Sequence, residues 1–290
     1  METIDVLVQL GIGFLIYFLF TFILILIGAN FPRKPVDKTP DWGVIQDKKI
    51  KTAKNKEIEA WIVTPNNVDE SKPAILLTHG WARNRGRMVD RARYYGKKGY
   101  ITILISARDH GNSDKERFGM SIVKFSIDIE AIVNWWGKPI ILNGHSIGGG
   151  ASLIVSSRNK LVLGSIIEAP MSSVPGGLID VYKPIFKQSV YFFALAIILI
   201  TELIIFWDKR RKDYSPLHSS KYVNTPTLII HGKFDDVFPY YKSNRFKKTI
   251  SDCKVQFYDE ADHSNLEFQA GYEELVTEFA DYINHNRLLK

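Results

Sequence analysis

The sequence has a single cysteine and lacks several motifs that would point to particular kinds of chemistry. Cys253 has no partner within the chain, so no internal disulfide can form. Because there is neither a cysteine cluster nor an H-E-x-x-H pattern, we expect no metal site. A G-x-G-x-x-G fingerprint is also missing, and a nucleotide cofactor therefore has no support. The sequence predicts a protein that works without a cofactor.

The positive charge of the chain is not arranged as in a nucleic-acid-binding protein. Lys and Arg number 38 against 31 Asp and Glu, but no nucleic-acid recognition motif accompanies them. The basic residues concentrate beside apolar segments, as at residues 209–212, where they can meet anionic lipid head groups. A solvated charged face is the alternative interpretation. We expect no nucleic-acid partner.

The apolar residues are unevenly spread over the 290 residues, and from Val6 to Pro32 the chain carries no charge. About 20 helical residues cross the roughly 30 Å hydrocarbon layer of a bilayer. Residues 1–32 are therefore predicted to form an N-terminal transmembrane anchor. A cleaved signal peptide is the alternative, but Glu2 and Asp5 stand where such a peptide has basic residues, and no A-x-A site follows.

The orientation of this predicted anchor follows from the basic residues at its ends. None precedes the segment, whereas a basic linker and first strand, residues 33–56, follow it. Its basic residues closest to the anchor are Arg33, Lys34, Lys38, Lys48, Lys49 and Lys51. By the positive-inside rule we expect a single-pass membrane protein whose bulk is cytoplasmic, with membrane lipids as partners. The oligomeric state is not indicated.

From residue 41 to residue 290 short apolar runs alternate with helical patterns, which is typical of an α/β domain with a mostly parallel sheet and helices on both faces. Eight strands are predicted: Gly43–Gln46, Ala60–Thr64, Ala74–Thr78, Ile101–Ile105, Ile140–Asn143, Leu163–Glu168, Thr227–Ile230 and Lys254–Tyr258. The helical patterns cover Arg87–Lys98, Ser121–Trp136, Ile147–Arg158 and Asn265–Leu289.

One connection, residues 171–225 after the sixth strand, is too long for this rhythm and is predicted to be a cap or lid insertion. Its apolar segment at 190–207 is long enough to raise the question of a second membrane span. A single crossing would put the last strands on the other side of the membrane from the first six, and one sheet cannot form that way. We therefore expect a helix that lies in the membrane interface or, alternatively, a buried cap helix.

The run Gly144-His145-Ser146-Ile147-Gly148 is a G-x-S-x-G motif between a predicted strand and a predicted helix. The sharp turn lifts the serine Oγ off the sheet edge, and the glycines leave room for the strained backbone. The helix N-terminus favours developing negative charge. Ser146 is therefore the candidate nucleophile.

A serine nucleophile needs a base, and the base needs an orienting carboxylate. The later strands supply candidates for both, because acidic residues follow the strands that end at Ile230 and Tyr258, and His263 follows the second of them. Ligands and catalytic groups collect at the carboxyl ends of strands in open α/β sheets. Asp235 is our candidate acid and His263 our candidate base.

These residues resemble the α/β-hydrolase superfamily, particularly its membrane-anchored esterase, lipase and serine-aminopeptidase-like members. The resemblance covers residue 41 to the end and is carried by LLTHGW at 76–81, ARDHGNSD at 107–114, NGHSIGGG at 143–150, SPLHSSKYVNTPTLIIHGKFDDVFP at 215–239 and ADHSN at 261–265. It implies an α/β-hydrolase fold, and its HG-x-x-D-x-x-x-P pattern selects Asp235 over Asp236. It also implies that the backbone N–H groups of Trp81 and Ile147 form an oxyanion hole.

The remaining histidines are expected to have structural roles. The resemblance departs slightly at Asp109-His110, where many relatives have glycine before the histidine, and we expect His110 to hold the loop rather than to form a second Asp–His pair. Three further histidines precede glycine or nucleophile turns and are expected to be structural rather than catalytic: His79, His145 and His231. His218 and His285 have no partner in the sequence pattern and are expected at the surface.

The resemblance implies a membrane-anchored serine hydrolase that cleaves an ester or thioester of a lipid-like acyl substrate through an acyl-enzyme. Two alternatives stay open. A serine aminopeptidase would use the same triad, with Glu168 or Glu202 as an acidic partner for the substrate's α-amine. A membrane-tethered binding protein would retain the fold without the chemistry.

Overall fold

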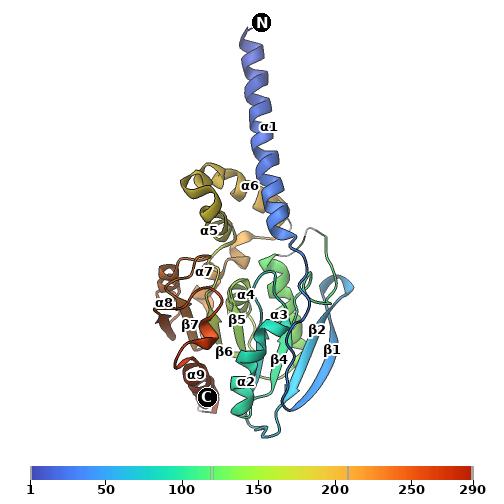
Figure 1. Ribbon diagram of the computed structural model, residues 1–290, viewed down its shortest axis with the longest axis vertical. Helices are drawn as coiled ribbons and strands as arrows, with labels where there is room; N and C mark the ends of the chain where they lie inside the picture. The colour runs from blue at the N-terminus through green and yellow to red at the C-terminus, as the bar shows by residue number, and fades with distance from the viewer. Residues whose placement is uncertain (1, 118, 120, 208, 289–290) are drawn as a thin grey trace.

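The computed structural model describes residues 2–117, 119, 121–207 and 209–288. An eight-stranded sheet with the order β1-β2-β4-β3-β5-β6-β7-β8 forms its centre (Figure 1). The strands are β1 (Val44–Thr52), β2 (Lys56–Thr64), β3 (Ala74–Thr78), β4 (Thr102–Ile105), β5 (Ile140–His145), β6 (Val162–Glu168), β7 (Thr227–Gly232) and β8 (Cys253–Tyr258). The order from β4 to β8 is parallel, whereas β2 is antiparallel to both of its neighbours. The eight predicted strands and the mostly parallel sheet are confirmed.

The first two strands extend further than the sequence predicted, because they form a hairpin around the turn Ala53–Asn55. In this turn Lys54 and Asn55 have positive φ angles of 59° and 53°. Strand β1 is largely exposed and carries Lys48, Lys49 and Lys51. Charged side chains suit an edge strand, because they discourage pairing with another chain. The polar composition of β1 concealed most of this strand from an analysis based on apolar runs.

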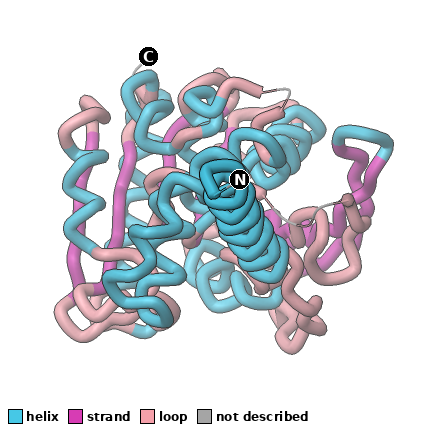
Figure 2. Tube along the Cα trace, turned by 90° about the horizontal axis from the view of Figure 1, so that it is seen from above, coloured by secondary structure: helices cyan, strands magenta, loops and turns pink. Residues whose placement is uncertain are grey.

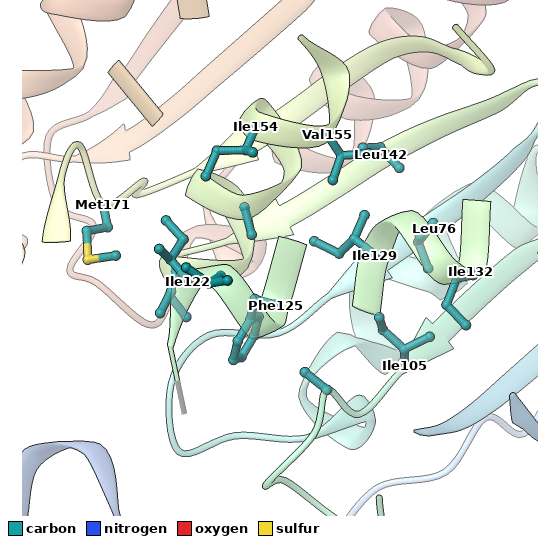
Figure 3. Close-up of a cluster of buried hydrophobic side chains, with 14 of the residues drawn as sticks. Leu76, Ile105, Ile122, Phe125, Ile129, Ile132, Leu142, Ile154, Val155 and Met171 are labelled. Atoms are coloured by element: carbon teal, nitrogen blue, oxygen red, sulfur yellow. The ribbon is translucent and has the colours of Figure 1, made fainter. Parts of the chain in front are cut away.

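Helices cover both faces of the sheet. Helices α3 (Ile122–Trp136) and α4 (Ile147–Ser156) pack on one face, and α2 (Val89–Lys97) and α9 (Tyr272–Leu288) on the other. Figure 3 shows the hydrophobic core between the sheet and the helices α3 and α4, where Ile129 of α3 packs with Leu76 and Leu142 of the sheet. Because parallel strands are buried on both faces, their sequences are continuous apolar runs, and this made them recognisable.

The predicted helices are present with small shifts at their ends. The most changed is the last helix, which begins at Tyr272 after Gly271, whose φ is 76°, rather than at Asn265. Its predicted end at Leu289 lies outside the described residues. The residues before α2 form a 3-10 turn, Arg85–Met88. Two short helices, α7 (Pro216–Ser219) and α8 (Asn244–Lys247), lie on either side of β7 in the chain.

The insertion after β6 forms a cap, as predicted, built from α5 (Val174–Phe186) and α6 (Ala194–Ile204). A 3-10 segment, Lys187–Phe193, connects the two helices, which contact each other. The stretch Val174–Ile204 is long and apolar enough to cross a membrane by length and composition. Each of its two helices, however, is shorter than the about 20 residues that a span requires.

Helix α1 (Glu2–Ala29) leaves the domain beside this cap and projects beyond it (Figure 1). Seen from the end at which it projects, it lies in front of the body of the molecule, with strands on both sides (Figure 2). It too is long and apolar enough to cross a membrane. Its last turns contact helix α6 of the cap, and Thr21 and Ile25 are buried in this part of α1.

Candidate active site

Ser146 lies between the end of β5 and the start of α4, in the turn that the G-x-S-x-G pattern predicted. Its φ of 58° and ψ of −121° are unusual for a residue with a side chain. The neighbouring glycines explain how this turn is tolerated. A Cβ on Gly148 would lie 2.4 Å from the backbone oxygen of His79, and one on Gly144 would lie 2.6 Å from the backbone oxygen of Gly148. Only glycine fits at both positions.

The structure brings Ser146, His263 and Asp235 together from three different loops at the carboxyl edge of the sheet. The Nε2 atom of His263 lies 3.0 Å from Ser146 Oγ, and its Nδ1 atom lies 2.7 Å from Asp235 Oδ2. The carboxylate accepts the Nδ1–H, which leaves Nε2 free to accept the serine proton. This is the arrangement of a nucleophile, a base and an orienting acid.

Asp235 is held in place by more than the base. Its Oδ1 accepts the backbone N–H groups of Val237 and Phe238 at 2.9 and 2.7 Å, and its Oδ2 also accepts the Nε2–H of His231 at 2.8 Å. Although burial on its own opposes ionisation, the hydrogen bonds from His231 and His263 hold the pKa of the Asp235 carboxyl well below its usual range. The carboxylate is therefore ionised at neutral pH. Asp236 is exposed.

The two predicted oxyanion donors have their N–H groups available. Within the described part of the chain, no acceptor takes the backbone N–H of Trp81 or of Ile147. Ile147 is the first residue of α4, where the N–H groups of a helix lack intrahelical partners. The loop that carries Trp81 continues into Ala82, which has a φ of 53°.

Two neighbouring histidines, His79 and His110, hold that loop, and their tilted rings have centroids 4.8 Å apart. His110 accepts the N–H of Ala82 and donates to the backbone oxygen of Arg108, while His79 accepts the N–H of Ala107 and donates to the backbone oxygen of Gly80. Burial lowers the pKa of both rings, so they are neutral. The predicted structural role of His110 is confirmed, because neither of its ring nitrogens bonds Asp109.

His145 and His231 also have structural partners. His145 donates from Nε2 to the backbone oxygen of His263 at 2.7 Å, and burial lowers its pKa well below the usual value. His231 accepts the hydroxyl of Ser243 at Nδ1 while it donates to Asp235. The sequence predicted that both rings are structural, but nothing in it indicated that His231 shares an oxygen of the triad acid.

Comparison with known proteins identifies the family of this fold. A family model described as "Serine aminopeptidase, S33" matches residues 69–201, which include Ser146 but end before Asp235 and His263. The AB hydrolase superfamily protein YisY of Bacillus subtilis is 22% identical over an alignment of 225 residues, and the match covers 65% of this chain and 84% of that protein. The chain belongs to the α/β-hydrolase superfamily. The family model and the similarity to this relative support a hydrolase.

Solved structures match this α/β-hydrolase to different extents. An esterase of Pyrococcus furiosus has a TM-score of 0.66 at 18% identity, and the match covers 88% of this chain and 97% of that one. A membrane phospholipase A, described as a bacterial virulence factor, has a TM-score of 0.62 at 14% identity and covers 98% of this chain and 99% of that one. Because the second match covers 98% of this chain, it must include most of the 28 residues of α1.

Glu168, which with Glu202 was a candidate partner for an amine in the aminopeptidase alternative, is fully buried in this hydrolase. Arg91 Nε donates to its Oε2 at 2.8 Å, and Asn143 and Tyr272 donate to its Oε1 at 2.9 and 2.7 Å. Both oxygens are thus occupied. The second candidate, Glu202, pairs with Arg211 in a separate surface pocket of the cap, away from Trp81 and Ile147.

The same buried network reaches the catalytic loop. Arg91 Nη1 lies 2.9 Å from Oε1 of the buried Glu267, and Arg87 pairs with that carboxylate as well. Arg87 also donates to the backbone oxygen of Ser264, which directly follows His263. No local pattern in the sequence indicated this network, because its members come from β5, β6, the segment that includes α2 and the turn before it, and the segment from Glu267 to the start of α9.

Two cavities meet at Trp81. One, of about 40 Å³, is lined by apolar side chains that include Ile147, Leu178 and Phe238, with Ser121 as the exception. The other, of about 280 Å³, is polar and is lined by groups of both charges. Its cationic residues are Arg33, Lys34 and Lys115, and its anionic residues are Asp109 and Glu116. Within the described residues no group of three or more His, Cys, Asp or Glu side chains is placed to hold a metal ion.

Proposed function

We propose that the protein is a membrane-anchored serine hydrolase that cleaves a carboxylic ester or thioester of a lipid-like acyl substrate. The observation that carries the proposal is the hydrogen-bonded chain from Ser146 through His263 to the buried Asp235 carboxylate, beside an apolar cavity. A serine beside a base that is itself oriented by an ionised carboxylate is an activated nucleophile.

The chemistry follows from these atoms. As Ser146 Oγ attacks the substrate's carbonyl carbon, His263 Nε2 accepts the hydroxyl proton, and Asp235 stabilises the resulting imidazolium. The carbonyl oxygen gains negative charge and accepts the N–H groups of Trp81 and Ile147. Collapse of the tetrahedral intermediate passes the proton to the leaving alcohol or thiol and leaves the acyl group on Ser146. Water then attacks by the same path and releases the carboxylic acid.

The dimensions of α1 support the membrane anchor. Before Thr21 no side chain described in this helix is fully buried. At about 1.5 Å per residue, the part from Glu2 to Phe20 is about 28 Å long, which is close to the thickness of the hydrocarbon layer. We propose that this part crosses the bilayer and that the segment from Thr21 onward belongs to the hydrolase domain.

Exposed apolar side chains on the cap support an interfacial position for it, next to α1. Phe192 is 69% exposed and Leu195 is 59% exposed, and the backbone oxygen of Phe192 accepts the hydroxyl of Tyr17 on α1 at 2.5 Å. An exposed apolar surface of this kind is expected where a protein rests in the interface of a bilayer. The apolar cavity between α1, the cap and Ile147 would then lie near the membrane and receive substrate from it.

The charges around the site favour an ester over an aminoacyl amide. An aminopeptidase needs a free carboxylate for the substrate's ammonium group, but Glu168 is buried and fully paired. In the polar cavity next to Trp81, Asp109 pairs with Lys124, and Glu116 pairs with Lys54 and Arg108. An ammonium group gains no unpaired carboxylate there. The relatives named as an esterase and a membrane phospholipase agree with this choice.

The test is hydrolysis by the purified full chain in detergent. p-Nitrophenyl butyrate and octanoyl-thioester substrates would be compared with p-nitroanilides of leucine, alanine and proline, each with the wild type and with Ser146→Ala. We expect Ser146-dependent hydrolysis of the esters or thioesters and none of the anilides. Hydrolysis of the anilides alone would support the aminopeptidase alternative, and no Ser146-dependent hydrolysis of either kind would support a binding protein.

A further inference from the structure

Two apolar voids lie one after the other along the side of α1 that faces the cap. The first is the cavity of about 40 Å³ at Ile147, and its wall includes Ala29 at the end of α1. The second, of about 10 Å³, is lined by α1, α5, the segment before α6 and α6 itself, and its wall includes Thr21 and Val190. Ile25 lines both voids. It therefore separates a cavity at the catalytic residues from a cavity nearer the projecting part of α1.

The position of Ile25 is fixed by close packing between α1 and the cap. Its side chain is 4% exposed, whereas that of Ile27 on the same helix is 63% exposed. A Cβ on Gly28 would lie 2.5 Å from the hydroxyl of Tyr182 in α5, so a residue larger than glycine would displace this hydroxyl. The hydroxyl of Tyr182 also donates to the backbone oxygen of Leu24. Ile25 is thus held against α5 and α6 by contacts on either side of it along α1.

The first void is lined by neighbours of the proposed catalytic residues. Ile147, in its wall, directly follows Ser146, and Phe238, also in its wall, has its ring centroid 5.4 Å from that of His263. Because its lining is apolar apart from Ser121, this void suits the hydrocarbon part of an acyl group attached to Ser146. An acyl chain that enters it from the serine meets Ile25 at the far side, next to the second void.

We propose that Ile25 closes the acyl pocket, so that α1 sets the acyl-chain length that the enzyme accepts in addition to anchoring it. This inference rests on the proposed ester hydrolysis. Truncation of Ile25 joins the two voids and makes a track that runs along α1 from Ala29 to Thr21, a distance of about 12 Å at about 1.5 Å per residue. A larger side chain at this position fills the first void and shortens the pocket.

The experiment measures kcat/KM for p-nitrophenyl butyrate and p-nitrophenyl laurate with the full chain in mixed micelles. The variants are Ile25→Ala, Ile25→Phe and the matched controls Ile27→Ala and Ile27→Phe, which make the same changes on the exposed side of α1. We expect Ile25→Ala to raise the laurate-to-butyrate ratio of kcat/KM about tenfold and Ile25→Phe to lower it by about as much, since one or a few methylenes in an apolar pocket change this ratio by that order. The Ile27 variants should leave the ratio within about twofold.

The same variants can be compared without turnover, by the rate at which ethyl and dodecyl fluorophosphonates label them. The labelling rate depends on how well the alkyl chain fits the pocket, even in a variant that releases its product slowly. The butyrate activity of each variant shows whether that variant is folded. An unchanged chain-length ratio in both Ile25 variants, or an equal change in the Ile27 variants, would overturn the proposal for Ile25. In that case Ser146-dependent butyrate hydrolysis by the wild type would leave the proposed function standing. If no ester is hydrolysed by the wild type, both proposals fall.

Discussion

The carboxylate of Asp235 lies 2.7 Å from Nδ1 of His263 and is buried, whereas the carboxylate of the next residue is exposed. Two adjacent aspartates therefore have different environments, and the chain offers a matched pair of variants. Asp235→Asn should lower kcat for butyrate ester hydrolysis by about 10³- to 10⁴-fold, because an amide can favour the wrong imidazole tautomer. Asp236→Asn should lower it by less than about threefold. Steady-state rates of the two purified variants test this prediction, and equal losses would contradict the assignment of the acid.

The neutral histidines behind the oxyanion loop predict a dependence of stability on pH. Burial lowers the pKa of His110, which is near 6.5 in an unfolded chain. Below about pH 6.5 the unfolded chain therefore binds more protons than the folded chain, so the stability that the neutral ring contributes is lost as the pH falls through its folded pKa.

The comparison that isolates this effect is between the wild type and His110→Gln, whose side-chain oxygen can still accept the N–H of Ala82. Burial raises the pKa of Asp128 to about 6, and this gives a pH dependence of the opposite sign. It is common to both proteins and cancels in the difference. The free energy of unfolding of the wild type minus that of the variant should fall between pH 7 and pH 5, as measured by urea denaturation in detergent. A difference that is constant or rises would contradict the buried neutral ring.

The buried ion pairs behind the catalytic loop predict a large effect on stability. Arg91 is 1% exposed and lies between the buried carboxylates of Glu168 and Glu267. Replacing it with methionine leaves the Glu168 carboxylate without its cation and Glu267 with Arg87 alone, and we expect a loss of about 3–5 kcal/mol in the free energy of unfolding. Arg93→Met is the control, because Arg93 pairs with Asp41 at the surface, where a pair contributes about 1 kcal/mol or less. Similar losses in the two variants would mean that the buried network does not stabilise the fold as described.

The proposed topology predicts opposite labelling of two exposed positions. The natural Cys253 is a poor probe, because burial raises the pKa of its thiol to about 11 and keeps it protonated. In a Cys253→Ala background, Thr3→Cys lies at the start of α1, and Lys160→Cys lies before β6, at the sheet edge opposite Ser146. An impermeant maleimide should label the first in intact cells and the second only after permeabilisation. The reverse result would place the hydrolase domain outside the cytoplasm.

The sequence predicted those parts of the protein that depend on local patterns. The central strands are apolar runs that end in turn residues, and the G-x-S-x-G motif located Ser146 because its glycines are required by the backbone itself. Loops after β7 and β8 meet at one edge of a parallel sheet, so Asp235 and His263 were also within reach of a sequence argument.

Contacts between distant segments were not predictable in this way. Glu168 was a candidate partner for an amine in the aminopeptidase alternative, because its position at the end of β6 does not reveal that Arg91, Asn143 and Tyr272 surround it. In the same way, the apolar run of α1 predicted an anchor, but it did not indicate which of its many apolar residues pack against the domain. Only the packing of α1 on the cap distinguishes Ile25, which lines the cavity, from Ile27, which is exposed.

The most direct test of the central claim, that Ser146 is the nucleophile of a serine hydrolase, is labelling of the full chain by a fluorescent fluorophosphonate. We expect the wild type to be labelled and Ser146→Ala to remain unlabelled. Ser157→Ala, at the far end of α4, removes a hydroxyl that only bonds the backbone oxygen of Ile154 and should be labelled like the wild type. Labelling that persists in Ser146→Ala would contradict the account.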